Sequence, residues 1–357
     1  MNSAVDAVIL VGGQGTRLRP LTLSAPKPML PTAGVPFLEH QLSRIRAAGI
    51  THVVLGTSYQ PEVFSSYFGD GSAFGLELEY VVETEPLGTG GAIGNVAGRL
   101  RADTVMIFNG DVLTGVDLGA LLAAHRDDAA DVTLYLTKVS DPRAFGCVPT
   151  GPDRRVEAFL EKHPEPRSDQ INAGAYVFSR EVVETIPTGR PVSVERETFP
   201  QLLSAGARVF GYVDSAYWRD LGTPADFVAG SADLVQGFAP TNALPGPIGP
   251  AVVLGGAEVA YRAVLVGGST IGADCAVGAD AVVDGSVVFD GARIGPGAVV
   301  RRSVVGAGAV VDAGAVIEDA VLGDGCHIMA GNELRNGARI WPGVVVAESS
   351  IRFSAPS

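Results

Sequence analysis

The chain has 357 residues, of which 46% are hydrophobic and only 18% are charged, and its formal net charge is −13. A chain of this length and composition can bury the cores of two domains. Its negative charge disfavours electrostatic binding to DNA or RNA, so nucleic acid is not expected as a partner. Any anionic ligand is therefore expected to be small and held by local groups.

The cysteines and the N-terminus bear on the compartment. Cys147, Cys275 and Cys326 are widely spaced and too few for a disulfide framework, which favours a reducing compartment. No basic segment followed by a long apolar core is present at the N-terminus, and the longest apolar runs have the length of strands. We therefore expect a cytoplasmic protein that does not insert into a membrane.

The apolar run from Val5 to Ile9 predicts a buried strand, and it leads directly into the stretch LVGGQGTRLRP at residues 10–20. Glycines let backbone N–H groups approach an anion closely. Thr16, Arg17 and Arg19 add a hydroxyl and two fixed cations, and Lys27 follows soon afterwards. The stretch is therefore predicted to bind phosphate.

Spacing excludes two common glycine motifs. The dinucleotide pattern G-x-G-x-x-G fails because Leu18 stands in the place of its third glycine, and no acidic residue follows until Glu39. The P-loop pattern fails because no lysine follows the glycines at the required spacing. A nicotinamide site and a P-loop ATPase are therefore disfavoured.

Residues 1–238 alternate between strand-like and helix-like apolar periods, which predicts a layered α/β domain. The clearest predicted strands cover residues 53–55, 78–82, 105–108 and 132–136, and the clearest helices cover 37–48 and 118–125. Residues 239–250 carry four prolines and are predicted to form a linker.

Residues 251–357 follow a six-residue period with occasional steps of five, which predicts a left-handed parallel β-helix. In such a fold the repeating aliphatic residue points into a narrow prism. The residues expected there are Ile271, Val277, Val283, Phe289, Val305, Val311, Ile317, Leu322, Ile328, Leu334, Ile340 and Val346. An acetyltransferase activity of this part is disfavoured because His327 is the only histidine beyond the linker.

Two carboxylates are candidates for a metal site. Asp111 follows a predicted strand, where ligand sites of α/β sheets lie, and Asp220 lies in a segment of aromatic and turn residues. Two hard oxygen ligands suit a Mg²⁺ ion that keeps waters and bridges phosphates. Farther along, Glu161, Lys162 and Asn172 supply groups suited to the hydroxyls and phosphate of a sugar phosphate.

The motifs LVGGQGTRLRPLTLSAPKP, PLGTGGA, NGD, FLEK, INAGAYVF, SVERETFP and YWRDLGTP occur here in one order. In this respect the chain resembles the sugar-1-phosphate nucleotidyltransferases. The resemblance covers the first domain, for which it implies a Rossmann-like, GT-A-like sheet, and the β-helix resembles that of the longer family members. One departure is visible, because His163 intervenes between Lys162 and Pro164 where the family has Glu-Lys-Pro.

The resemblance implies a role for each matching residue. Arg17, Lys27 and Lys162 would neutralise phosphates during catalysis, and Asp111 and Asp220 would hold Mg²⁺. The nucleotide would contact Leu10, Gly12, Gly13, Gly15, Thr16, Glu83, Pro86, Gly88, Thr89, Asn109 and Gly110. The sugar phosphate would contact Gly146, Glu161, Lys162, Asn172 and Gly174.

The reaction implied is attack of a hexose 1-phosphate on the α-phosphorus of a nucleoside triphosphate. The resemblance favours guanylyl transfer from GTP to mannose 1-phosphate. On that basis Glu83, with Glu85 as second choice, is expected to accept both neighbouring donors of guanine. The alternatives are thymidylyl or uridylyl transfer to glucose 1-phosphate, GDP-glucose synthesis, or a non-catalytic nucleotide-sugar sensor. The β-helix is expected to mediate homo-oligomer formation.

Overall fold

The computed structural model describes residues 4–353. The chain groups into two compact units, one made of Met1–Gly13 with Leu42–Trp218 and the other of Gln14–Gln41 with Arg219–Ser357. The later part of the glycine-rich stretch therefore packs with the C-terminal part of the chain. The sequence-based division into residues 1–238, 239–250 and 251–357 stays a prediction.

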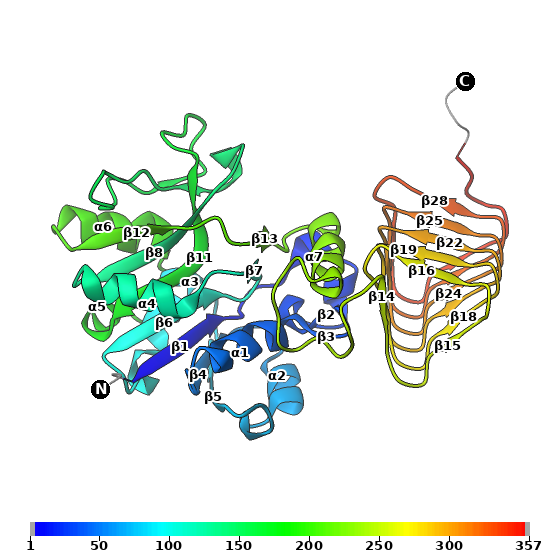
Figure 1. The fold of residues 1–357 in the computed structure, drawn as a ribbon, viewed down its shortest axis with the longest axis horizontal. Helices are drawn as coiled ribbons and strands as arrows, with labels where there is room; N and C mark the ends of the chain where they lie inside the picture. Colours follow the sequence, from blue (N-terminus) through cyan, green and yellow to red (C-terminus); the bar gives the residue numbers. More distant parts are fainter. Residues whose placement is uncertain (1–3, 354–357) are drawn as a thin grey trace. The chain divides into compact units, whose positions relative to one another are not determined.

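Over the described residues, the first unit is built around a nine-stranded sheet (Figure 1). Its path is β10-β9-β11-β6-β1-β4-β5, with β8 beside β11 and β12 beside β8. Strand β1 is parallel to β4 and β6, and β11 is antiparallel to β6. The strands are β1 (Val5–Leu10), β4 (His52–Thr57), β5 (Glu77–Val82), β6 (Thr104–Asn109), β8 (Val132–Lys138), β9 (Gly146–Cys147), β10 (Leu160–Glu161), β11 (Gln170–Ser179) and β12 (Val209–Val213), with the short β7 (Val112–Thr114) outside this sheet.

The helices of this region confirm the predicted alternation of strands and helices. They are α1 (Phe37–Ala47), in which the boundary between the units falls, α2 (Pro61–Phe68), α3 (Gly88–Asn95), α4 (Leu118–Asp127), α5 (Arg180–Thr185), the π-helix η7 (Val194–Thr198) and α6 (Phe199–Ser204). The 3₁₀ turns are η4 (Ser72–Phe74), η5 (Ala97–Arg99) and η6 (Pro142–Ala144). Helix α4 begins where Asp117 accepts the backbone N–H groups of Gly119 and Ala120, an N-cap that replaces missing intrahelical partners.

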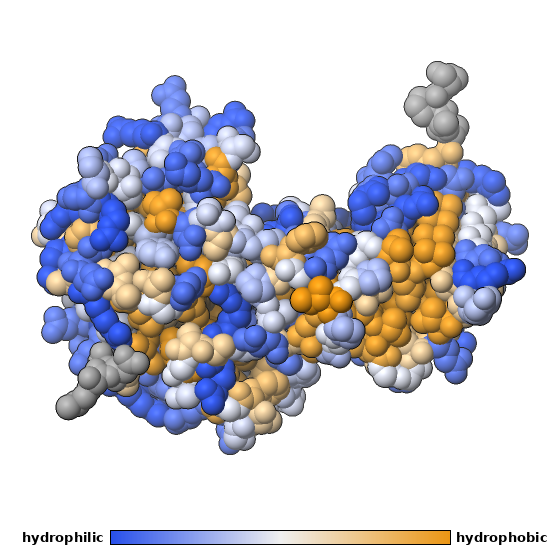
Figure 2. Space-filling view, viewed as in Figure 1, coloured by the Kyte–Doolittle hydropathy of each residue, from blue (hydrophilic) through white to orange (hydrophobic). Residues whose placement is uncertain are grey.

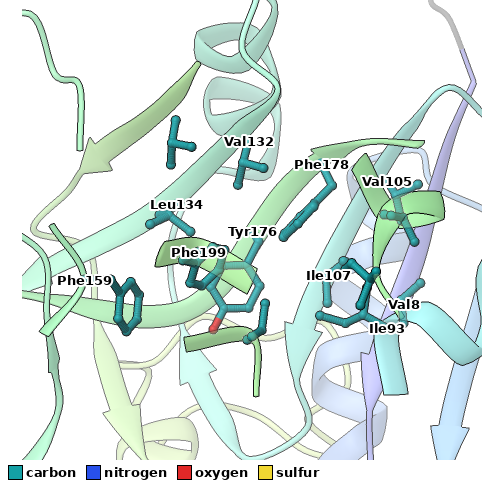
Figure 3. Packing of buried hydrophobic residues seen from close by; sticks show 14 of the residues in the cluster. Val8, Ile93, Val105, Ile107, Val132, Leu134, Phe159, Tyr176, Phe178 and Phe199 are labelled. Atoms are coloured by element: carbon teal, nitrogen blue, oxygen red, sulfur yellow. The ribbon is translucent and has the colours of Figure 1, made fainter. Parts of the chain in front are cut away.

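The core of the first unit explains its continuous apolar strands. Val8 of β1 and Ile107 of β6 are fully buried and pack with Ile93 of α3, while Tyr176 and Phe199 pack in the same cluster (Figure 3). Strands of a parallel sheet that is covered on both faces read as unbroken apolar runs rather than alternating ones. This packing fixes the sheet whose strand ends carry the candidate site residues.

The second unit contains three parallel sheets, as the hexapeptide period predicted, and they agree with a left-handed β-helix (Figure 1). One sheet runs β14 (Ala251–Val253), β17 (Ser269–Ile271), β20 (Val287–Val288), β23 (Val304–Val305), β26 (Val321–Leu322) and β29 (Arg339–Ile340). A second runs β15 (Glu258–Val259), β18 (Ala276–Val277), β21 (Arg293–Ile294), β24 (Val310–Val311), β27 (His327–Ile328) and β30 (Val345–Val346). The third runs β16 (Val264–Val266), β19 (Val282–Asp284), β22 (Val299–Arg301), β25 (Val316–Glu318) and β28 (Glu333–Leu334).

The remaining elements of the second unit are short except for one helix. They are η1 (Thr16–Leu18), η2 (Leu21–Leu23), η3 (Lys27–Met29), β2 (Pro31–Thr32), β3 (Val35–Pro36) and α7 (Pro224–Gln236). Strand β13 (Trp218–Asp220) contains the boundary between the units. Thr223 caps α7 by accepting the backbone N–H of Asp226.

The prediction for the prism interior was wrong at Phe289. Val283 and Val288 lie in the interior cluster, whereas Phe289 packs in a separate cluster on the outside. The reason is a step of five at this turn, which shifts the inward position by one residue. In a strand, a shift of one residue moves a side chain to the opposite face.

Two further features concern the helices and the cysteines. Among residues 4–353, no helix combines the length and apolarity needed to cross a bilayer. Cys147, Cys275 and Cys326 are all buried free thiols. Burial raises the pKa of the Cys326 thiol to about 12, so this cysteine packs as a neutral apolar group.

Candidate functional site

The glycine-rich stretch and the NGD motif leave neighbouring strands at the same edge of the sheet. Leu10 at the end of β1 pairs with Asn109 at the end of β6. The Gly110 N–H donates to the Leu10 carbonyl at 2.9 Å, and a Cβ on Gly110 would lie only 2.6 Å from that oxygen. Glycine is therefore required here, and the first unit brings Gly12 and Asp111 to one edge.

Asn109 also lies against β11, where a second group of predicted residues gathers. A Cβ on Gly174 would lie 3.0 Å from Nδ2 of Asn109, and the φ of Gly174 is +76°. The Gly174 N–H donates to Oδ1 of Asn172 at 3.1 Å, and Nδ2 of Asn172 donates to the Tyr176 hydroxyl at 2.7 Å. Three residues predicted from sequence are thus brought together, with a fully buried tyrosine beneath them.

Glu161 and Lys162 differ in their surroundings. Glu161 pairs with Gly146, where a Cβ would lie 2.8 Å from its Oε2. The Lys162 ammonium lies 3.9 Å from Oε1 of Glu161, with its side chain 62% exposed against 19% for the glutamate. The positive φ of Lys162, +49°, is uncommon for a residue with a side chain and is often found at functional sites. The ammonium is therefore open to a ligand.

The additional residue His163 is accommodated by a local turn. Its Nδ1 accepts the Glu165 N–H at 3.2 Å, while the Lys162 N–H donates to the Phe145 carbonyl at 3.0 Å. The backbone of Lys162 is thus hydrogen-bonded next to β9, although His163 departs from the family pattern.

Glu195 was not among the site residues predicted from the sequence, although it lies in the motif SVERETFP. Burial raises the pKa of Glu161, and the negative charge of Glu195 adds to this shift. Oε2 of Glu195 accepts hydrogen bonds from the hydroxyls of Thr89 at 2.7 Å and Ser193 at 2.8 Å. A second carboxylate therefore acts on Glu161, and only the fold brings it there.

The segment predicted to face the base is held in a tight turn. Glu83 is 8% exposed, and its Oε2 accepts the Leu87 N–H at 3.2 Å. Burial raises the pKa of Glu83, and the Leu87 hydrogen bond opposes this shift. Pro86 and Glu85 are exposed in the same turn.

Gly88 and Thr89 tie this turn to the 192–195 segment. A Cβ on Gly88 would lie 2.7 Å from the Val192 carbonyl oxygen, and its φ is +68°. The Thr89 hydroxyl accepts the Val194 N–H at 3.0 Å and donates to Glu195. The structure thus gives both residues an internal packing role in addition to the predicted contact with a nucleotide.

Gly13 belongs to the first unit, whereas Gly15, Thr16, Arg17, Lys27 and Asp220 lie in the second. The Lys27 ammonium lies 3.9 Å from Oδ1 of Asp220, and the two side chains are 10% and 29% exposed, respectively. A Cβ on Gly222 would lie 2.9 Å from Nη2 of Arg17 and 3.0 Å from Oδ2 of Asp220. Gly222 therefore leaves space beside the Arg17 guanidinium and the Asp220 carboxylate. Gly15 is close to Lys27, and its carbonyl accepts the Thr22 hydroxyl at 2.9 Å.

Two of the predicted site residues are carboxylates, the ligand type that a divalent cation such as Mg²⁺ prefers. Asp111 belongs to the first unit and Asp220 to the second. Within residues 4–353, no three or more His, Cys, Asp or Glu side chains are arranged to hold a metal among themselves. Mg²⁺ is commonly held by one or two carboxylates, with waters and substrate phosphates as its other ligands. Each of the two carboxylates is a ligand of this kind within its own unit, and Gly222 leaves space beside Asp220.

Comparison with known proteins defines the class. Residues 6–237 match the family described as Nucleotidyl transferase, and residues 247–353 match the GMPPB C-terminal domain. The chain therefore belongs to the nucleotidyl transferase family.

Particular relatives extend over different parts of the chain. It is 61% identical to a mannose-1-phosphate guanylyltransferase of Mycobacterium tuberculosis over 98% of both chains. It is 34% identical to mannose-1-phosphate guanylyltransferase 1 of Arabidopsis thaliana, over 77% of this chain and 75% of the relative. Among solved structures it is similar to HddC of Yersinia pseudotuberculosis complexed with GMP-PN, with 28% identity and a TM-score of 0.56, covering 64% of this chain and 99% of HddC.

Proposed function

We propose that this chain transfers the GMP moiety of GTP to mannose 1-phosphate, forming GDP-mannose and releasing pyrophosphate. The observation that carries the proposal is the 61% identity, over 98% of both chains, to a mannose-1-phosphate guanylyltransferase. The complex of HddC with GMP-PN supports a guanine nucleotide as the donor.

The phosphates of GTP are bound by the glycine-rich stretch and its cations. Backbone N–H groups around Gly12, Gly13 and Gly15 supply donors that need no side chain. Arg17 and Lys27 supply two positive charges within the second unit, where Lys27 lies 3.9 Å from Asp220 and Arg17 borders Gly222. Such preorganised cations stabilise the charge that builds up on the phosphates as the leaving group departs.

Asp111 and Asp220 would hold Mg²⁺, as the family motifs imply. When bound, the ion neutralises phosphate oxygens and polarises the α-phosphorus. The protein contributes two hard oxygen ligands and leaves the remaining positions to phosphates and water.

Mannose 1-phosphate is bound beside β9, β10 and β11. The exposed Lys162 ammonium faces its phosphate, and the Glu161 carboxylate accepts sugar hydroxyls. The Asn172 amide is already oriented by Gly174 and Tyr176, so it offers its hydrogen bonds in one fixed direction. This preorganisation lowers the entropy lost when the sugar binds.

The chemistry needs no general base. The attacking phosphate oxygen of mannose 1-phosphate is already anionic, and it forms a bond to the α-phosphorus while the bond to pyrophosphate breaks. The protein accordingly has to align two polyanions and offset their repulsion. Arg17, Lys27 and Lys162 supply that compensation without a nucleophilic serine or cysteine.

Glu83 is the group that distinguishes guanine, with Glu85 second. An ionised carboxylate can accept N1–H and the exocyclic amine of guanine together, whereas uracil and thymine offer one donor. The turn held by the Leu87 N–H fixes the direction of the Glu83 carboxylate. Because Glu83 is 8% exposed, its hydrogen bonds to a base would be poorly screened by water.

We propose further that the β-helix mediates association with a second copy of the chain in the cytoplasm. Val264, Val282, Val299 and Val316 form a row at one register position of the sheet β16-β19-β22-β25. Apolar residues also gather on the β-helix face seen in Figure 2. Contiguous apolar patches mark protein contact sites. Light scattering on the eluting protein should give a multiple of 36.7 kDa, and Val282→Lys should lower it.

The test of the activity is product formation by the purified chain with GTP, mannose 1-phosphate and MgCl₂. GDP-mannose identified by mass, with an equal amount of pyrophosphate, is the expected result. A chain that binds GDP-mannose but releases no pyrophosphate would instead be a sensor, and the proposal would be wrong.

A further inference from the structure

Leu18 connects the phosphate-binding stretch to the β-helix inside the second unit. It is fully buried, although its neighbours Arg17 and Arg19 are exposed. Its cluster contains Leu21, Leu30, Phe227, Val228, Val287, Phe289, Val304 and Val321. The segment that carries the cations therefore packs against α7 and against one outer face of the β-helix.

That outer face is a ladder of identical positions. Val287, Val304 and Val321 follow one another in register on β20, β23 and β26, while the alternate residues of these strands fill the prism. The next position in the ladder, on β29, is Arg339. An apolar face that covers Leu18 thus ends in a single cation.

Arg339 binds the backbone on both sides of Leu18. Its Nη1 donates to the carbonyl oxygen of Arg17 at 2.9 Å and to that of Arg19 at 2.8 Å. A hydrogen bond from a charged donor is stronger than a neutral one. The Arg17 carbonyl lies within the three-residue 3₁₀ turn Thr16–Leu18, and the Arg19 carbonyl directly follows it. Such short turns are weak when nothing else supports them.

We propose that Arg339 is a positioning residue for nucleotide binding. It holds the backbone of Arg17 and Arg19 and thereby fixes the direction in which the Arg17 guanidinium projects toward the GTP phosphates. The β-helix accordingly takes part in substrate binding through strand β29, in addition to its proposed role in association with a second copy of the chain. This inference rests on the proposed function, because it assigns Arg17 to the phosphates.

The experiment compares Arg339→Ala, Arg339→Lys and Arg293→Ala in the full chain. Arg293 is the matched control, because it is an exposed outward arginine on β21 of a different sheet. Two quantities are measured for each variant. One is amide hydrogen exchange of residues 14–21, which needs no activity, and the other is the KM for GTP and for mannose 1-phosphate.

In Arg339→Ala we expect faster exchange at the Leu18 and Arg19 amides, which bond within the turn. We expect the KM for GTP to rise about tenfold, the effect of losing one charged hydrogen bond, with the KM for mannose 1-phosphate unchanged. Arg339→Lys should recover most of both effects, and Arg293→Ala should match the wild type.

The outcomes separate this inference from the proposed function. Unchanged exchange in Arg339→Ala would overturn the positioning role even if GDP-mannose is made. Faster exchange with an unchanged KM for GTP would overturn the link to the nucleotide. A wild type that makes no GDP-mannose would instead reject the proposed function, and the exchange data would still decide whether Arg339 holds the turn.

Discussion

The Nζ of Lys27 lies 3.9 Å from Oδ1 of Asp220. The two residues come from near the beginning and the end of the domain predicted for residues 1–238. Lys27 follows the glycine-rich stretch, whereas Asp220 precedes α7. The Arg17 guanidinium and the same carboxylate both border Gly222, where a Cβ would lie 2.9 Å from Nη2 of Arg17 and 3.0 Å from Oδ2 of Asp220. A lysine beside a carboxylate, with an arginine at the neighbouring glycine, suits a site that binds phosphates and a metal ion.

Removal of either proposed magnesium ligand should abolish turnover. We expect Asp111→Ala and Asp220→Ala to lower kcat by at least about a hundredfold, because each loses a charged ligand of the ion that neutralises the phosphates. Steady-state kinetics at saturating Mg²⁺ measures this, and thermal melts check the fold. Asp153→Ala, which removes an exposed carboxylate of the first unit, should behave as the wild type. Near-normal kcat in either ligand variant would show that its carboxylate is misassigned.

Lys162→Ala should weaken the use of mannose 1-phosphate. The lost ammonium faces the sugar's phosphate, so we expect kcat/KM for this substrate to fall by about ten- to a hundredfold, the range for a lost charged hydrogen bond. The KM for GTP should change little. Lys138→Ala is a matched control, because Lys138 is an equally exposed lysine of the same unit. Equal kcat/KM in the two variants would remove Lys162 from the site.

Glu161→Gln should stabilise the protein while weakening sugar binding. Burial and the charge of Glu195 raise the pKa of Glu161, so the folded chain binds its proton more tightly than the unfolded chain does. As pH rises through this raised pKa, the ionised carboxylate therefore costs stability.

Thermal melts across pH measure that cost. The melting temperature of Glu161→Gln should exceed that of the wild type at neutral pH, and the difference should narrow as pH falls toward the ordinary range of a glutamate. The same variant should need more mannose 1-phosphate, because an amide is a weaker acceptor than a carboxylate. A melting temperature below that of the wild type at neutral pH would contradict this account.

Glu83→Gln should relax the choice of nucleotide. The amide oxygen can still accept the Leu87 N–H, so the turn is kept while the charge is lost. Losing a charged hydrogen-bond pair costs about 1.5–3 kcal/mol, or roughly ten- to a hundredfold in preference for GTP. The ratio of kcat/KM for GTP to that for dTTP measures this, with Glu85→Gln tested in parallel. Unchanged selectivity in both variants would overturn the carboxylate mechanism alone.

The fold could be predicted where a local pattern determines it. Buried parallel strands read as apolar runs, and a β-helix repeats its inward residue every six positions, so both parts were predicted. Phe289 was misplaced because a single five-residue step between Val283 and Val288 exchanges the inner and outer positions. A periodicity count cannot locate such a step when both Val288 and Phe289 are apolar.

The site was predictable only as far as motifs extend. Asn109, Asn172 and Gly174 were expected, and the structure brings them together through contacts of β6 and β11. Glu195 and Arg339 were not predicted, because each acts on a group far away in the sequence. Glu195 acts on the Glu161 carboxylate, and Arg339 binds the backbone carbonyl of Arg17. No sequence spacing relates Arg339 to Arg17, because the two meet only through the place of β29 in its sheet.

The most direct test of the central claim is a matrix of kcat/KM values for the wild-type chain. GTP, dTTP, UTP and ATP are each paired with mannose 1-phosphate and with glucose 1-phosphate, and the nucleotide sugar formed is identified by mass. The account predicts that GTP with mannose 1-phosphate gives the highest value, above every other pair by roughly tenfold or more, the effect of one lost charged hydrogen bond. Preference for dTTP or UTP with glucose 1-phosphate would contradict it.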